Sequence, residues 1–377
     1  MSRAASRWAD RPRRGLGSGG CAALVFAAVS LALAACQSAA PGAGPQGAAP
    51  PPGVADAYQR AVLAARGNQF AGALEAVRQV VDRAPDWLPG HWLYQDVARQ
   101  LGGAAEQAMR DFYAGFRPST PWVESLCRAR LLPTAYERDR ALRAVLAQHP
   151  GCAFAHQSLA RNLHAEGRFL AAADAYEQAL RADPKRFDAR RERAEVLVEI
   201  GRWDEAAAEF QTYLDAVPED DPARRALTTL LLYRLGRLEQ AKRNLDVLEA
   251  RLPDDLDLWM DRAAALWLGG EPLRALAKYR AVLERRPDTP RALWNVGLLY
   301  FEELGKQPAA RARYWPAARA AFTLFLQGPV PQDGFDQFER AVAVPVRLQR
   351  IQQVLGPAPA EPPGWRDVWG ALEGEDS

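Results

Sequence analysis

Apolar side chains between Gly151 and Pro184 fall into two short runs, each with the spacing of one helix face. Leu159 and Leu163 lie four residues apart and predict the buried face of a first helix. A second helix is predicted by apolar residues at spacings of three and four, at Phe169, Ala172, Tyr176 and Ala179. Gly167 can adopt the positive φ that turns the chain, and Pro184 cannot continue a helix. The stretch therefore predicts two short helices joined by one tight turn.

The same pattern recurs at steps of 34 or 35 residues. The matching positions are Gly201, Gly236 and Gly270 for the turn, Ala206, Ala241 and Ala275 for the small residue, Phe210, Leu245 and Tyr279 for the large residue, and Pro150, Pro218, Pro253 and Pro287 for the proline. This pattern resembles the tetratricopeptide repeat family, whose unit is a helix–turn–helix of 34 residues. The resemblance implies an all-α solenoid of about eight repeats over residues 54–327.

Three less regular copies precede the clear ones, at about 54–86, 89–120 and 119–152. In the third copy, Pro133 stands where the turn glycine is expected, and Arg138 stands where the small alanine is expected. The pattern therefore leaves open how that helix pair packs.

The eighth copy begins at Trp294 and carries about nine extra residues around Gly305 to Tyr314, before the pattern resumes at Ala318. Insertions in repeat proteins map to loops on one face, which often bind ligands. We expect such a loop here.

A C-terminal helix over residues 334–355 is expected to cap the last repeat. Residues 356–377 form a proline-rich linker and a tail, which is either disordered or docked. One helical face of the tail is apolar, with Trp365, Val368, Trp369 and Leu372. Our hypothesis is that this face docks into the groove formed by the last repeats.

Residues 1–35 have the pattern of a signal peptide, with an arginine-rich start and an apolar run of 15 residues from Cys21 to Ala35. The run ends in Leu33-Ala34-Ala35-Cys36, which resembles the bacterial lipobox and implies lipidation of Cys36. The alternatives are ordinary cleavage or an uncleaved anchor. Gln37 after the cysteine favours the outer membrane, facing the periplasm. Residues 36–53 contain no large apolar residue and predict a disordered, lipidated tether.

Charge and motifs narrow the function further. The net charge is +2, but residues 1–35 hold five arginines against one aspartate, so the remainder carries −2. This balance argues against nucleic-acid binding and leaves the lipid anchor as the only expected membrane contact. No nucleotide-binding, hydrolase or metal motif occurs, and acidic runs such as 219–221 are typical of solvated helix caps. We therefore expect a protein that is not an enzyme and binds neither cofactor nor metal.

Two cysteines remain in the predicted mature fold, Cys127 and Cys152, in an oxidising compartment. They lie on or next to the first helices of adjacent repeats. A disulfide between them and two separate buried thiols both remain open.

The family resemblance implies that the first helix of each repeat lines an inner groove. In repeats four and five the groove positions are polar, and they include Arg161 and Arg191. In repeats six to eight they are mostly apolar, at Leu230, Tyr233, Met260, Trp267, Trp294, Leu298 and Phe301. Exposed aromatic residues in a groove mark peptide recognition, so we expect the apolar part to be the main binding surface. The alternative is that neighbouring repeats or the capping helix bury these residues.

The function expected from these observations is that of a scaffold or adaptor lipoprotein. It would bind other envelope proteins or peptides during assembly of an envelope complex, such as a pilus secretin, the β-barrel assembly machinery or a polysaccharide exporter. The alternative is a regulatory subunit of an envelope enzyme complex.

Overall fold

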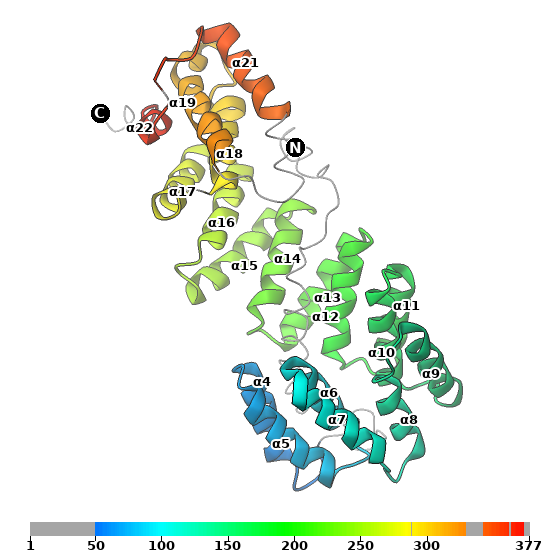
Figure 1. Ribbon diagram of the computed structural model, residues 1–377. Coiled ribbons are helices and arrows are strands. Elements are labelled where there is room, and N and C mark those ends of the chain that lie inside the picture. The colour runs from blue at the N-terminus through cyan, green and yellow to red at the C-terminus, as the bar shows by residue number, and fades with distance from the viewer. Residues whose placement is uncertain (1–49, 288, 329–341, 362, 373–377) are drawn as a thin grey trace. The chain divides into compact units, whose positions relative to one another are not determined.

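A computed structural model describes residues 50–287, 289–328, 342–361 and 363–372 (Figure 1). These residues form helices and loops, with no β-strand among them. The predicted signal peptide, Cys36 and residues 334–341 of the predicted capping helix lie outside the described residues. The described chain divides near residue 230 into two compact units.

The first unit is a succession of helix pairs. Its helices are α4 (Ala55–Arg66), α5 (Phe70–Arg83), α6 (Leu88–Leu101), α7 (Gly103–Gly115), α8 (Pro121–Ala129), α9 (Ala135–Gln148), α10 (Ala153–Ala165), α11 (Phe169–Ala182), α12 (Phe187–Glu199) and α13 (Trp203–Ala216). Each even-numbered helix packs against the odd-numbered helix that follows it in the chain. Helix α14 (Asp221–Tyr233) begins in this unit and ends in the next.

The second unit continues the pairs and then departs from them. It contains α15 (Leu238–Arg251), α16 (Leu256–Leu268), α17 (Pro272–Arg285), α18 (Pro290–Leu298), the π-helix η1 (Leu299–Leu304), α19 (Pro308–Gln327), α21 (Val344–Leu355) and α22 (Trp365–Trp369). With α18 and η1 counted as one first helix, the described chain holds eight helix pairs. The predicted all-α repeat architecture is confirmed.

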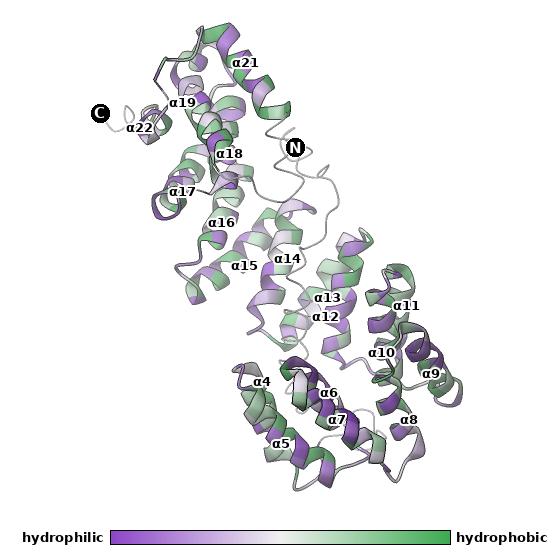
Figure 2. Cartoon of the chain, viewed as in Figure 1, coloured by the Kyte–Doolittle hydropathy of each residue, from purple (hydrophilic) through white to green (hydrophobic). Residues whose placement is uncertain are grey.

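The sequence pattern correctly located the turns between paired helices. Gly167, Gly201, Gly236 and Gly270 have φ values of 73°, 77°, 63° and 80°, in the left-handed region that a side chain disfavours. The helices are amphipathic, so hydrophobic and hydrophilic residues alternate along them (Figure 2). None of the described helices is long and apolar enough to cross a membrane.

A contact that the sequence analysis did not foresee recurs at the junctions between repeats. The proline that ends a repeat has a carbonyl oxygen without a donor from a helix. A side chain six residues later forms a hydrogen bond with this oxygen. The pairs are His91 Nε2 to Pro85 (2.9 Å), His156 Nε2 to Pro150 (2.8 Å), Arg190 Nη2 to Pro184 (3.3 Å), Arg224 Nη2 to Pro218 (3.0 Å) and Trp259 Nε1 to Pro253 (2.9 Å). Three different residue types perform this task, so no single-letter motif reveals it.

The irregular third repeat forms a normal helix pair by other means. Thr134 and Glu137 form a capping box at the start of α9, in place of the turn glycine. Arg138 Nε donates to Asn162 Oδ1 in the next repeat at 2.9 Å, and its Nη1 donates to Leu132 O at 2.9 Å. The arginine therefore replaces close helix packing by hydrogen bonds to the turn and to the next repeat.

The prediction of a binding loop in the eighth repeat is wrong. The extra residues lengthen the two helices instead: the first helix continues as η1, and α19 runs for 20 residues with Pro316 inside it. Trp315 stacks on Phe301 with ring centroids 4.8 Å apart, and its Nε1 donates to Phe301 O at 3.3 Å. Gly305 ends the π-helix where a Cβ would meet the Trp315 ring at 2.4 Å.

The C-terminal tail packs against the second unit, but not in the predicted groove. Helix α22 lies against α19, with Val368 and Trp369 buried. The guanidinium of Arg280 in α17 lies 5.6 Å from the centre of the Trp369 ring, and Arg313 Nε in α19 donates to Ala371 O at 3.3 Å. The tail therefore contacts second helices of the last two repeats, rather than the first helices that were predicted to line the groove.

Candidate functional site on the first helices of the first unit

The apolar groove residues are not exposed in the structure. Six of the seven have exposed fractions between 2% and 8%: Leu230, Met260, Trp267, Trp294, Leu298 and Phe301. Tyr233 is half-buried, and its hydroxyl donates to Asp261 Oδ1 at 2.8 Å. The expectation of an exposed aromatic surface in repeats six to eight is therefore wrong.

Neighbouring helices and α21 account for this burial. All but Leu230 and Tyr233 belong to one continuous apolar core, against which Tyr233 packs. Arg347 in α21 forms an ion pair with Glu302 in η1 at 3.2 Å, and the guanidinium of Arg350 lies 6.0 Å from the centre of the Phe301 ring. Helix α21 thus covers the first helix of the eighth repeat, which consists of α18 and η1, as a capping element does.

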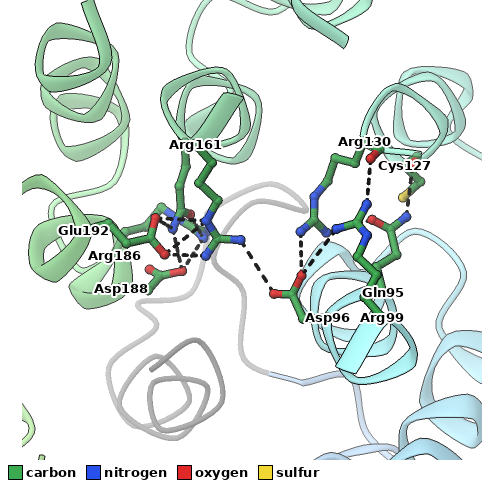
Figure 3. Close-up of polar contacts among 10 residues, drawn as sticks. Gln95, Asp96, Arg99, Cys127, Arg130, Arg161, Arg186, Asp188 and Glu192 are labelled. Carbon is green, nitrogen blue, oxygen red and sulfur yellow. Dashed lines mark hydrogen bonds and ion pairs between the residues drawn. The ribbon is translucent and has the colours of Figure 1, made fainter. Parts of the chain in front are cut away.

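The first unit instead carries a network of arginines and carboxylates on successive first helices (Figure 3). We call it the arginine–carboxylate network, and it comprises Asp96 and Arg99 of α6, Arg130 at the end of α8, Arg161 of α10, Arg186 before α12, and Asp188 and Glu192 of α12. Gln95 and Gln157 connect its parts. Its members come from four repeats, so the network holds successive repeats in register.

One end of the network is centred on Asp96. Arg130 Nη2 donates to Asp96 Oδ1 at 2.8 Å, and Arg130 Nη1 donates to Gln95 Oε1 at 2.8 Å. Gln95 Nε2 in turn donates to Cys127 O at 2.9 Å, and Arg99 Nη2 donates to Arg130 O at 2.6 Å. The end of α8 is therefore held by side chains of α6, because its carbonyl groups lack helical donors.

Arg161 joins this end to the next repeat. Its Nη2 lies 2.5 Å from Glu192 Oε1, and its Nε lies 3.0 Å from Glu192 Oε2, which is a bidentate pair. Its Nη1 faces Asp96 Oδ2 at 3.6 Å. Figure 3 shows Arg161 reaching toward both carboxylates from between them.

The middle of the network is closed by Gln157. Gln157 Nε2 donates to Asp188 Oδ2 and to Glu192 Oε2, at 3.0 Å each, and Gln157 Oε1 accepts from Arg186 Nε at 2.9 Å. The Arg186 guanidinium stacks 3.7 Å from the centre of the Phe154 ring. Arg130 stacks in the same way on Trp92, at 3.6 Å. Both buried guanidinium groups thus stack on an aromatic ring in a cation–π contact.

Arg191 extends the polar surface toward α14. Its Nε lies 3.2 Å from Glu195 Oε1, and its Nη1 donates to Asp220 Oδ2 at 3.2 Å. Tyr213 Oη also donates to Asp220 Oδ2, at 2.6 Å. Asp220 was expected to be a solvated cap, but it is buried. It does cap α14, since its Oδ1 accepts from the backbone N–H of Ala223 at 2.9 Å.

The pKa shifts follow from this crowding. Burial alone would raise the pKa of Asp96, but Arg130, Arg161 and Arg99 outweigh it and lower the pKa. Burial lowers the pKa of Arg130 to about 10, and the neighbouring guanidiniums add to that effect. Burial also raises the pKa of Glu195 to about 7, against the opposing influence of Arg191. The Asp96 carboxylate is therefore firmly charged, whereas the Glu195 carboxylate, beside Arg191, titrates near neutrality.

The two cysteines lie beneath this surface as free thiols. Cys127 and Cys152 are both fully buried and form no disulfide with each other in the structure. Burial raises the pKa of the Cys127 thiol to about 12. A thiol with this pKa is a weak nucleophile at neutral pH, so its role here is packing.

The repeat pattern predicted Arg161 and Arg191 at this site, but not Asp96, Arg99, Arg130 and Glu192. The structure brings Arg161 into the network, whereas Arg191 pairs with other carboxylates. Arg130 could not be found from the repeat pattern, because it lies at the end of the shortened first helix of the irregular third repeat. The signal that existed was the polar composition of the groove positions in repeats four and five.

Comparison with protein-family models locates matches in the middle of the chain. Residues 163–231 match one model described as tetratricopeptide repeat, and residues 230–282 and 269–321 match a second model with the same description. A search of curated proteins found no match.

Solved structures with the same kind of helix pairs also match. One is a tetratricopeptide repeat protein from Parabacteroides merdae ATCC 43184, with 14% identity over 79% of this chain and 98% of that chain, and a TM-score of 0.36. Another is YrrB, described as a TPR protein with an unusual peptide-binding site, with 18% identity over 56% of this chain and 99% of that chain, and a TM-score of 0.42. Neither likeness carries a ligand over to this chain.

Proposed function

Because the chain is a tetratricopeptide repeat protein, we propose that it is a non-catalytic scaffold that binds segments of other proteins along the first helices of its first unit. The observation that carries the proposal is the arginine–carboxylate network. Arg99 and Arg161 keep 35% and 25% of their side-chain surface exposed, whereas the apolar groove positions of the second unit are covered. Partly exposed charged groups held in fixed positions by buried neighbours suit recognition, because little ordering is needed on binding.

We further propose that the scaffold acts at the outer membrane, on the periplasmic side, as part of the assembly of an envelope complex. The support is the arginine-rich, apolar leader that ends in Leu33-Ala34-Ala35-Cys36, followed by Gln37 and a tether without large apolar residues. Lipid chains on Cys36 would hold the repeats near the membrane, and the tether would supply reach. Partners would then be envelope proteins or peptides.

Site-specific photo-crosslinking in cells tests the binding face. A photoreactive phenylalanine analogue replaces Glu199, an exposed residue at the end of α12, and, as a control, Asp139 on the second helix α9. The expected result is a discrete crosslinked protein from position 199 and none from position 139. Equal crosslinking from both positions, or no crosslinking from either position, would count against the proposed binding face.

The anchor is tested separately. Replacing Cys36 by serine removes the thiol that would carry the lipid, so incorporation of radiolabelled palmitate into the chain is expected to disappear. The protein is then expected to move from the membrane fraction to the soluble fraction. Retention of the label in the Cys36→Ser variant would refute lipidation at this residue.

A further inference from the structure

Three guanidinium groups converge on the single carboxylate of Asp96. They come from three different first helices: Arg99 from α6, Arg130 from the end of α8 and Arg161 from α10. Only Arg130 is hydrogen-bonded to Asp96, at 2.8 Å. The other two form longer ion pairs with the same carboxylate.

The unsatisfied donors are two terminal nitrogens. Arg99 Nη1 lies 3.8 Å from Asp96 Oδ1, and Arg161 Nη1 lies 3.6 Å from Asp96 Oδ2. Both distances exceed that of a hydrogen bond. Each of these nitrogens carries two N–H groups, and each side chain is partly exposed, as described above. Two guanidinium nitrogens without a hydrogen bond therefore lie beside one carboxylate, on side chains that are 35% and 25% exposed.

The charges at this place do not balance. Glu192 and Asp188 are the other carboxylates of the network; Arg161 engages Glu192 in a bidentate pair, and Arg186 pairs with Asp188. The four guanidiniums of the network thus face three carboxylates, which leaves one surplus positive charge. Burial and the nearby Arg161 and Arg110 lower the pKa of Arg99, against the opposing effects of Asp96 and Glu106.

We propose that the first helices α6, α8 and α10 bind an acidic side chain of a partner protein, whose carboxylate lies between Arg99 and Arg161. This proposal rests on the proposed scaffold function and names the chemistry that the scaffold recognises. A planar carboxylate accepts one hydrogen bond on each oxygen and so matches two guanidinium donors. Its single negative charge cancels the single surplus positive charge. A phosphate dianion would exceed that charge and would meet stronger repulsion from Asp96 than a singly charged carboxylate.

A direct binding measurement tests the proposal. The full chain in detergent is titrated into fluorescein-labelled hexaglutamate, and binding is followed by fluorescence anisotropy, with labelled hexaglutamine as the neutral counterpart. The expected result is binding of hexaglutamate that weakens as salt is raised, and at least tenfold weaker binding of hexaglutamine. Equal binding of the two peptides would overturn the proposal.

Variants assign the binding to the arginine pair. Arg99→Gln should weaken hexaglutamate binding about tenfold, because one charge-assisted hydrogen bond is lost. Arg99→Lys keeps the charge without the planar fork and should show a smaller loss. Arg143→Gln is the matched control, since this exposed arginine of α9 pairs with Asp139 within its own helix. Equal loss in Arg99→Gln and Arg143→Gln would show that overall charge, rather than this site, binds the peptide.

Two further readings separate this proposal from its alternatives. Inorganic phosphate that competes with the peptide more strongly than acetate at equal ionic strength would mean that the site prefers phosphate, and the proposal would be wrong. If Arg99→Gln leaves hexaglutamate binding unchanged while the Glu199 crosslink persists, the acidic-ligand proposal fails and the scaffold function stands. If the crosslink is absent but the peptide still binds through Arg99, the proposed scaffold function fails instead.

Discussion

The corresponding helices of the two units carry opposite chemistry on the same kind of scaffold. In the first unit, the first helices of the pairs carry Asp96 and Arg161 and hold them in a hydrogen-bonded network. In the second unit, they carry Trp294 and Phe301, which are buried in a continuous core and, at the last repeat, flanked by α21. The repeat fold fixes where a side chain lies, and the residue type decides whether that place becomes a surface or an interior.

The comparison also separates two ways of joining repeats. Apolar contact dominates among the first helices of the second unit and needs only shape and volume. The first unit has an apolar core too, but its first helices add charged groups, each of which must find its own partner because a buried unpaired charge is costly. We therefore expect a cavity to be the worst change in the second unit, and an orphaned charge to be the worst change in the first.

The largest effect is expected for Trp315→Ala in the second unit. The substitution removes a buried ring that stacks on Phe301 and should destabilise the protein by about 4 kcal/mol. Hydrogen exchange followed by mass spectrometry should show faster exchange in α18, η1 and α19, and little change in α6 to α12. Trp315→Phe keeps most of the ring and should cost about 1 kcal/mol, for the lost bond to Phe301 O. Faster exchange spread evenly over both units would contradict the separation.

A slightly smaller effect is expected for Asp96→Asn in the first unit. The substitution preserves the shape of the side chain but leaves Arg99, Arg130 and Arg161 without their shared charge. Breaking this largely buried interaction should cost about 3 kcal/mol in denaturant unfolding. Asp139→Asn is the matched control, because its pair with Arg143 is exposed and should contribute less than about 0.5 kcal/mol. Similar costs for the two substitutions would show that the network does not join the repeats.

Protonation of His91 should loosen the first unit by an amount of similar or smaller size. His91 is fully buried, and burial lowers its pKa to about 4 from an ordinary value of 6.5. Its Nε2 donates to Pro85 O, and in the neutral form its Nδ1 accepts from the hydroxyl of Tyr113. The unfolded chain therefore takes up a proton at a higher pH than the folded one.

The sign of the pH effect follows from that difference. The contribution of His91 to stability should be complete above pH 6.5 and be lost as the pH drops from 6.5 toward 4, by at most about 3 kcal/mol. Glu195, whose pKa is raised to about 7, contributes with the opposite sign over the same range. Urea unfolding at a series of pH values therefore measures the His91 contribution as the difference between the unchanged protein and His91→Gln. Hydrogen exchange should place the loosening in α6 and α7, around His91. A pH dependence that His91→Gln leaves unchanged would assign the effect to other groups.

Much of the fold followed from a few spaced residues. The positive φ of Gly167 and its counterparts, and the prolines that end each repeat, are local backbone requirements, so they are readable from one sequence. The insertion in the eighth repeat was not readable in this way. Whether extra residues form a loop or lengthen two helices depends on Trp315 finding Phe301 across the pair, which is a tertiary contact.

The site was less predictable than the fold for a related reason. The pattern placed Leu298 and Arg161 at equivalent groove positions, but exposure there depends on the neighbouring helices. Helix α21 comes from outside the repeats, and its contact with η1 through Arg347 could not be inferred from periodicity. Likewise, Arg130 joins Asp96 only because α8 ends early and brings that arginine opposite α6.

The bond that five of the terminating prolines form with the side chain six residues later has a consequence for how such an array can grow. Donor and acceptor both lie in one short stretch at the start of a repeat, as in Arg190 with Pro184 or Trp259 with Pro253. A block of chain cut just before the proline therefore carries its own complete junction. Such blocks can be duplicated, deleted or exchanged without leaving a carbonyl unpaired, so the length of the array is free to change while every joint stays intact.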